Sequence, residues 1–233
     1  TNLGLTPEIY SCNEGYSLDG KKCINESDAT DIVDAIKDTT LHEAHSIGGY
    51  TGESPLSMAA AYAAFANNGT YTEPYSFTKL IYQETNEEYT NEIKSNKAMS
   101  SETAYMISDM LVTTAPFALG GHYNVNGIKY AAKTGTTNYD SKTIQSHKLP
   151  YYAVNDLWTI GYNTEYSIGV WYGYDFIDKD YCNSVNSPQH TRLFQAVAKK
   201  IFTNKKEFTR PNSVVAVEVE SGCAVAMLPS ECT

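Results

Sequence analysis

The stretch 126–140, NGIKYAAKTGTTNYD, decides the fold and raises the question of function. Its first part reads as a β-strand, and we predict a strand over Gly127–Thr136. Two further strands are predicted at Leu157–Tyr162 and Tyr166–Tyr172, joined by Asn163-Thr164-Glu165, a loop short enough for a tight hairpin. We therefore expect three consecutive strands that pair antiparallel.

Helices are predicted around these strands. Ser54-Pro55 supplies an N-cap and an N1 proline for a helix through LSMAAAYAAFA, and Asn67-Asn68-Gly69 ends it. A second helix is predicted over 101–114, capped by Ser100 or Ser101, and a third over Gln189–Ile201. For the second helix we predict an apolar face made of Tyr105, Met106, Met110 and Leu111.

The remaining segments are less regular. We predict an acidic helical stretch at Ser27–Asp38, one or two strands within Tyr71–Thr90, and a strand at Ser213–Val219. A polar insertion, Asn138–Val154, contains His147 and follows the first of the three strands. Antiparallel strands covered by helices predict an α+β domain with an antiparallel sheet flanked by helices.

The composition is that of a globular chain, with 42% hydrophobic and 19% charged residues over 233 positions. The net charge of -10 disfavours nucleic-acid partners, because an acidic surface repels phosphate backbones. No apolar run approaches the roughly 20 residues of a membrane span. The sequence points to no cofactor.

The five cysteines predict two short disulfides, with Cys182 left over. Cys12 and Cys23 flank one polar turn, and Cys223 and Cys232 flank another. Such bridges would indicate an oxidising, extracytoplasmic setting, whereas five reduced cysteines remain the alternative. No cysteine spacing suits zinc, and His42 and His45 in LHEAH lack a third ligand, so we expect no metal site.

The residues KTGTT suit one wall of an acyl-transfer site. Lys133 supplies a cation, and the hydroxyls of Thr134 and Thr136 can bind a carboxylate. Gly135 lets a peptide lie close to the strand and pair with it, and the N–H of Thr136 can donate to an oxyanion. Thr137 would shape the strand end. Three such residues also recur by chance in surface turns, so the motif alone is weak.

The surrounding sequence resembles the transpeptidase domain of class A, bifunctional penicillin-binding proteins. The resemblance is carried by KTG together with GESPLSMAAAYAAFANNGTYTEPYSFTKL, NDLWTIGYNTEYSIGVWYGYD and RPNSVVAVEVESGCAVAMLPSEC, over roughly residues 45–82 and 100–233. It implies the penicillin-binding protein transpeptidase fold, shared with serine β-lactamases. Two departures from the pattern are residues 114–126, which lack its glycine- and threonine-rich run, and the long insertion Asn138–Val154.

The family's chemistry requires Ser-x-x-Lys, then Ser-x-Asn, then Lys-Thr-Gly, in chain order. Literal matches begin at Ser76 for the first motif and at Ser11 and Ser184 for the second, but none has the required order or context. We therefore expect both catalytic serines to precede residue 1. On this expectation, residues 1–204 are the C-terminal part of the transpeptidase domain, and residues 205–233 are a tail or the start of a linker.

The resemblance implies a peptidoglycan D,D-transpeptidase. A serine would attack a D-Ala-D-Ala stem peptide, D-alanine would leave, and an amine of a second stem peptide would resolve the acyl-enzyme. β-Lactam antibiotics would acylate the same serine, while Lys133, Thr134, Gly135 and Thr136 hold the carboxylate. The partners implied are stem peptides, β-lactams and the upstream half of the same protein. The location implied is the extracytoplasmic face of a bacterial membrane, through an N-terminal anchor.

Three alternatives stay open. A serine β-lactamase-like hydrolase would need a water-activating base, and no such arrangement is visible in the sequence. A class B penicillin-binding protein would share KTG but follow a different upstream domain. A non-catalytic peptidoglycan-binding scaffold would lack the serines altogether. Within the strands, Trp158 is interpreted as a core residue and Asp156 as a strand cap.

Overall fold

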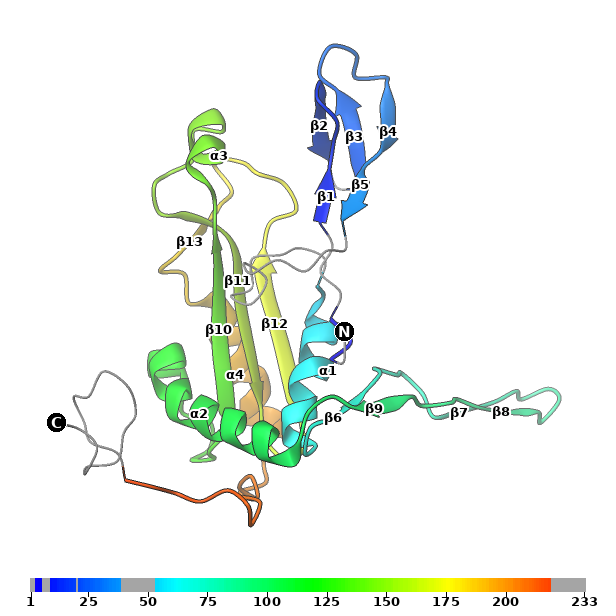
Figure 1. Cartoon of the computed structure of the whole chain (residues 1–233), viewed down its shortest axis with the longest axis vertical. Coiled ribbons are helices and arrows are strands. Elements are labelled where there is room, and N and C mark those ends of the chain that lie inside the picture. The colour runs from blue at the N-terminus through cyan, green and yellow to red at the C-terminus, as the bar shows by residue number, and fades with distance from the viewer. Residues whose placement is uncertain (1–2, 6–8, 20, 39–52, 219–233) are drawn as a thin grey trace.

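A computed structural model of the chain describes residues 3–5, 9–19, 21–38 and 53–218, and its centre is one antiparallel sheet (Figure 1). β10 (Ala131–Asn138) pairs with β11 (Ala153–Tyr162), and β11 pairs with β12 (Ser167–Gly173). The short β13 (Asn183–Ser184) pairs with the start of β11. The three predicted strands are thus present in the predicted order, although the first begins at Ala131 rather than Gly127.

The β11–β12 connection is the predicted tight hairpin. The side-chain oxygen of Asn163 accepts hydrogen bonds from the backbone N–H groups of Glu165 (2.9 Å) and Tyr166 (2.8 Å). An asparagine that bonds to the backbone of its own turn fixes the loop locally. The hairpin therefore sets the register that places Trp158 opposite Trp171.

One face of the sheet packs on α4 (Gln189–Ile201), which begins and ends at the predicted residues. Phe194 and Ala198 of this helix are fully buried, as is Ala132 of β10. These residues belong to the main apolar core, which also contains Ala115, Leu119, Val125, Ile128, Tyr130, Ile168, Val170 and Phe202. Burial of these apolar side chains is the main force that holds α4 on the sheet.

The opposite face packs on α1 (Pro55–Ala66) and α2 (Ser101–Leu119). The predicted cap of α1 is present, with Ser54 Oγ accepting from the Ser57 N–H at 3.1 Å. Tyr162 marks this face, because its ring packs against rings of α1 and its hydroxyl lies 3.0 Å from Ser108 Oγ of α2. Strand alternation therefore assigns Ala131, the partner of Tyr162, to the same face.

The predicted apolar face of α2 was wrong in part. Met106 and Met110 are exposed, Tyr105 and Leu111 are half-buried, and the buried residues of the helix are Ala104, Ser108, Ala115 and Leu119. Three of these four buried side chains are small, which lets the helix axis approach β10 and α1 closely. The helix also continues past 114, to Leu119, before the 3-10 turn η2 (Gly120–His122).

The N-terminal region forms small β-sheets. β1 (Ile9–Ser11) pairs with β5 (Ile36–Asp38), and β2 (Tyr16–Asp19), β3 (Lys22–Asn25) and β4 (Ile32–Asp34) pair in that order. The predicted helix over Ser27–Asp38 is therefore wrong. Its first residues form turns, in which Asp28 accepts from the Thr30 N–H, and its Ile-Val pair suits a strand.

The predicted disulfide between Cys12 and Cys23 is present in this N-terminal region. Cys182 is a free cysteine and is half-buried. Cys223 and Cys232 lie outside the described residues, as do His42 and His45.

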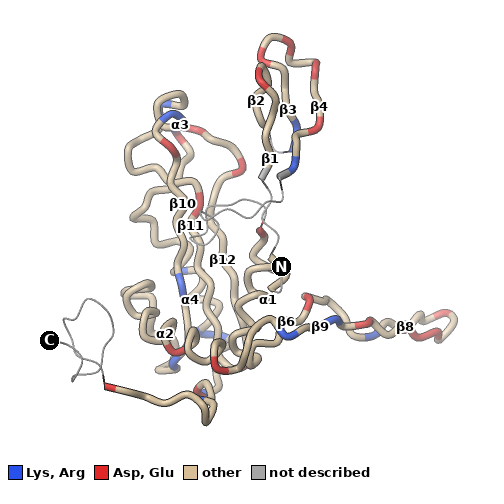
Figure 2. The backbone as a smooth tube through the Cα atoms, in the orientation of Figure 1, with Lys and Arg blue, Asp and Glu red and all other residues tan. Residues whose placement is uncertain are grey.

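A two-stranded arm projects from the body of the molecule after α1 (Figure 1). β6 (Thr70–Thr72) pairs with β9 (Ser95–Lys97), and further out β7 (Lys79–Ile81) pairs with β8 (Glu88–Thr90). Strands were predicted here as far as Thr90. Figure 2 shows acidic residues both on this arm and on the N-terminal sheets.

The insertion after β10 contains the short helix α3 (Ser141–Ser146), capped by Asp140. After α4, the chain crosses the end of the sheet without regular structure. Phe208 packs edge-on against Tyr162 at 5.5 Å, and Ser213 Oγ donates to Glu102 at 2.8 Å. The strand predicted over Ser213–Val219 is absent from its described part, 213–218. None of the described helices combines the length and the apolar character that crossing a membrane requires.

Candidate active site

The five residues Lys133 to Thr137 all lie in β10, which is an edge strand among the described residues. β10 pairs with β11 along one side only, so alternate N–H and C=O groups on its other side have no strand partner there. An extended peptide can add to such an edge by main-chain hydrogen bonds. The predicted motif therefore occupies the part of the sheet where a peptide could be received.

Register divides the motif between the two faces of the sheet. Lys133 pairs with Ile160, Gly135 with Trp158 and Thr137 with Asp156. Alternation places these residues on the same face as Ala131, which is the face on which α1 and α2 pack. Thr134 and Thr136 alternate to the α4 face, so their hydroxyls can reach a ligand only around the open edge of β10.

Lys133 has an exposed side chain, and its Nζ donates to the carbonyl of Thr134 at 2.8 Å. It forms no salt bridge with any acid of the described residues, unlike Lys79 and Lys129, which pair with Glu88 and Glu207. A single neutral carbonyl leaves the ammonium group with unused donors. Lys133 is therefore able to take an anionic ligand without breaking an ion pair.

Apart from its chain neighbours, one heavy atom of the described residues lies within 4 Å of the position that a Cβ on Gly135 would take. A Cβ built on it would lie 3.4 Å from the Cβ of Trp158, which is an ordinary contact. Its backbone is not in the left-handed region either. The described residues therefore do not require glycine at this position, in contrast to Gly161, where a Cβ would lie 2.4 Å from the ring of Phe194.

Two strand residues have roles that the sequence did not reveal. Trp158, predicted to be core, is half-buried and lies beside Gly135. Asp156, interpreted as a strand cap, lies inside β11, and its Oδ1 accepts from the indole N–H of Trp171 at 2.7 Å. Asp156 and Trp158 are two residues apart in a strand, so their side chains lie on one face of the sheet. This alternation could have identified them from the sequence as neighbours on one face.

The literal serine motifs do not form a catalytic group in the structure. Ser76 is an exposed loop residue before β7, and the lysine of its motif, Lys79, pairs with Glu88 across the arm. Ser11 lies in β1 and Ser184 in β13, on other elements of the fold. None of the three was expected to be catalytic. Within the described ranges there is also no group of three His, Cys, Asp or Glu side chains that could hold a metal.

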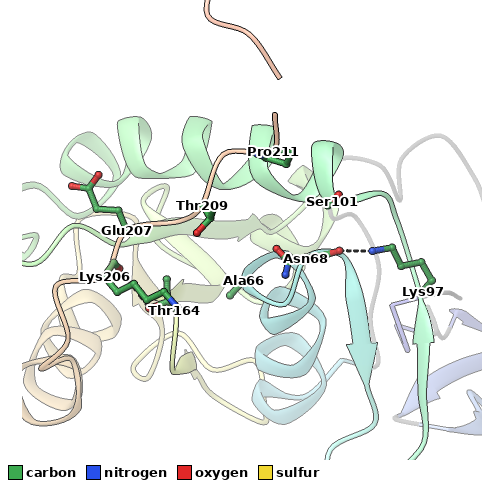
Figure 3. Close-up of a pocket in the computed structure, with 9 residues that line it drawn as sticks. All are labelled: Ala66, Asn68, Lys97, Ser101, Thr164, Lys206, Glu207, Thr209 and Pro211. Atoms are coloured by element: carbon green, nitrogen blue, oxygen red, sulfur yellow. Dashed lines mark hydrogen bonds between the residues drawn. The ribbon is translucent and has the colours of Figure 1, made fainter. Parts of the chain in front are cut away.

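A pocket of about 580 Å³ is lined by Thr164 of the β11–β12 turn (Figure 3), so it lies at the Ala131 end of β10 and away from Asn138. It is formed between the C-terminal segment, the end of α1 and the start of α2. Its lining is mostly polar and includes Ser101, Thr164, Lys97, Lys206 and Thr209. Lys97 already donates to the carbonyl of Asn68, and the pocket contains no residue of the KTGTT motif.

The family model and the curated relatives that match this chain all belong to the penicillin-binding proteins. The model of the penicillin-binding protein transpeptidase domain matches residues 25–202. Penicillin-binding protein 1A/1B of Bacillus subtilis is 38% identical over 197 residues, which are 80% of this chain and 21% of that protein. Penicillin-binding protein 1A of Streptococcus pneumoniae is 38% identical over 124 residues, 53% of this chain and 17% of that protein. The chain thus spans about a fifth of the length of these relatives.

Solved structures agree on the fold. PonA1 of Mycobacterium tuberculosis aligns with a TM-score of 0.50 at 22% identity, covering 66% of this chain and 40% of that one. Penicillin-binding protein 3 from the same organism, in complex with aztreonam, aligns with a TM-score of 0.50 at 18% identity, covering 67% of this chain and 37% of that one. These structures support the fold, and the family-model match over residues 25–202 together with the Bacillus subtilis relative establishes that the chain belongs to the penicillin-binding protein transpeptidase family, in the branch of the class A proteins.

Proposed function

We propose that the chain supplies the KTG wall of a peptidoglycan D,D-transpeptidase that works through a serine acyl-enzyme and is acylated by β-lactams. Lys133 and the hydroxyls of Thr134 and Thr136 hold the carboxylate of a D-Ala-D-Ala stem peptide or of the drug. Gly135 lets the ligand approach the strand, and the N–H of Thr136 donates to the oxyanion. Thr137 shapes the end of the strand.

The observation that carries this proposal is the combination found on β10. Strand β10 combines an open edge, a lysine without a salt bridge among the described residues, and a glycine. Among the described residues, no packing contact requires a glycine there. A free edge supports main-chain pairing with a peptide, and a lysine supports binding of its carboxylate. Neither feature is explained by packing.

The nucleophilic serine and its lysine come from the upstream half of the protein, which we propose as a partner of this chain. One surface available to it is the outer face of α2, which exposes Met106, Met110 and Phe117, the last of them 86% exposed. Their spacing places them on one side of the helix, and apolar side chains lined up in this way mark a surface that another segment covers.

The location proposed is the extracytoplasmic face of a bacterial membrane, reached through an N-terminal anchor. The Cys12–Cys23 disulfide supports it, because such bridges persist in oxidising compartments. We also propose that residues up to 204 are the C-terminal part of the transpeptidase domain and that a tail begins at 205.

A pair of lysine variants tests the function. In the natural full-length protein, Lys133→Ala should lower the rate of labelling by a fluorescent penicillin by about 10- to 100-fold, given the roughly 1.5–3 kcal/mol of a charged hydrogen bond. Lys129→Ala should label at the wild-type rate, because Lys129 lies outside the motif and pairs with Glu207. Equal labelling of both variants would remove Lys133 from the site. Rapid turnover of penicillin would indicate a β-lactamase-like hydrolase, and absence of labelling in the wild type would indicate a scaffold.

A further inference from the structure

The face that carries Lys133 and Gly135 continues across the sheet as two rows of residues. One row runs from Gly135 of β10 through Trp158 of β11 to Trp171 of β12. The neighbouring row runs from Thr137 through Asp156 to Gly173. The side chains of Asp156, Trp158 and Trp171 are only half-buried, so this part of the face is not fully covered by the described helices. We call these three residues the tryptophan floor.

A hydrogen bond joins the two rows. The indole N–H of Trp171 donates to Asp156 Oδ1 at 2.7 Å, which is a short, charge-assisted bond. The second oxygen, Oδ2, accepts from the side-chain amide of Asn155 at 2.9 Å. With both oxygens engaged, the carboxylate has one defined orientation and holds the indole ring with it.

The position of the ring depends on Gly173. A Cβ built on Gly173 would lie 2.2 Å from Cζ2 of Trp171, so the ring lies across the space that a side chain would fill. Trp171 thus leans out of its own row towards Asp156. Trp158 is left as the side chain that borders Gly135, with the tilted Trp171 on its other side.

Strand β13 braces the same place. The side-chain amide of Asn183 donates to the carbonyls of Asn155 (3.1 Å) and Tyr172 (3.2 Å), which precede Asp156 and Gly173. Three strands are therefore tied together at the level of the floor. Supporting hydrogen bonds of this kind hold a surface in a fixed shape.

We propose that Asp156 is a positioning residue, which acts through Trp171 and Trp158 to fix the floor beside Gly135 against which the ligand lies. This inference depends on the proposed function, because it assumes that the ligand adds along β10. Without the Asp156–Trp171 bond, the indole of Trp171 is free to turn towards Trp158 and to displace the ring that borders Gly135. The reacting group would then be held in a less productive geometry, and misplacement of about 1 Å can cost 10²-fold in rate.

The test uses the natural full-length protein and four substitutions, one of them a control. Asp156→Ala and Gly173→Ala should each lower the acylation rate constant at saturating fluorescent penicillin by about 10- to 100-fold. Asp156→Asn should retain most of the rate, because its amide oxygen still accepts the indole N–H. The exposed Asp175 gives a matched control, and Asp175→Asn should behave as wild type. Thermal unfolding should stay within a few degrees of wild type for all of the Asp variants.

The outcomes separate the two proposals. Acylation of Asp156→Ala at the wild-type rate overturns the positioning role while leaving the proposed function intact. A loss of acylation that only parallels a loss of thermal stability, or that Asp156→Asn does not rescue, also overturns it, because the residue would then be structural. A wild-type protein that fails to acylate overturns the proposed function and this inference together.

Discussion

Gly135 and Gly161 offer the sharpest comparison in the molecule, because both lie in the central sheet and only one is required by packing. A Cβ at Gly161 would lie 2.4 Å from the ring of Phe194, which is fully buried and cannot move aside. We expect Gly161→Ala to destabilise the fold by about 1–3 kcal/mol, the usual cost of overpacking a core. A Cβ at Gly135 would make only an ordinary contact of 3.4 Å with Trp158.

Gly135→Ala should therefore leave the free energy of unfolding within about 0.5 kcal/mol of wild type, as for substitutions away from packed sites. Its acylation by penicillin should fall by at least about tenfold, equivalent to 1.4 kcal/mol, because the methyl group occupies the space through which a ligand approaches the strand. Thermal unfolding and fluorescent-penicillin labelling of both variants in the natural protein measure the two effects. A stable Gly135→Ala protein that acylates at the wild-type rate would refute the reasoning, as would a Gly135→Ala protein that unfolds like Gly161→Ala.

Three further predictions concern stability. Breaking the Cys12–Cys23 disulfide by Cys12→Ser should destabilise the N-terminal β-sheets by about 3 kcal/mol in the chain-entropy model, whereas Cys182→Ser should change stability little. Limited proteolysis within residues 9–38 distinguishes the two variants. Tyr162→Phe removes the hydroxyl that bonds to Ser108 and should cost about 1 kcal/mol in chemical denaturation. Burial lowers the pKa of His190 below its usual value, so the folded state binds fewer protons than the unfolded state there. The contribution of His190 to the free energy of unfolding should therefore be fully present above the unfolded pKa of about 6.5 and be lost as the pH drops below it. His190→Gln should make the free energy of unfolding less dependent on pH in this range.

Elements with strong local signals could be predicted from the sequence. The bounds of α4 follow from its amphipathic pattern, and the start of α1 follows from Ser54-Pro55. The β11–β12 hairpin follows from two apolar runs around Asn163. In each case the local preference and the tertiary environment agree.

The errors arose where long-range packing decides. The helix predicted over Ser27–Asp38 yields to pairing of Ile32–Asp34 with β3, the strand before it in the chain, and of Ile36–Asp38 with β1, which is distant in sequence. The face of α2 was misjudged because buried positions were assumed to be large and apolar. Helix α2 instead buries two alanines, a serine and only one large apolar residue, Leu119, and it leaves Met106 and Met110 exposed.

The candidate site was predicted in part. KTGTT could be found as a motif, but its position on an open edge depends on which strand neighbours it, which the sequence does not state. The bond between Asp156 and Trp171 joins residues 15 apart that meet only because the β11–β12 register is fixed. The neighbour of Gly135 on this face is Trp158, which the β10–β11 register sets and no local pattern encodes.

The measurement that tests the central claim most directly is identification of the residue that penicillin acylates. The natural full-length protein would be treated with penicillin, digested and mapped by mass spectrometry. The account predicts the adduct on a serine N-terminal to residue 1, with labelling lost on Lys133→Ala. An adduct on any residue within positions 1–233, such as Ser76, would contradict the claim that this chain supplies one wall of the site and the upstream half supplies the nucleophile.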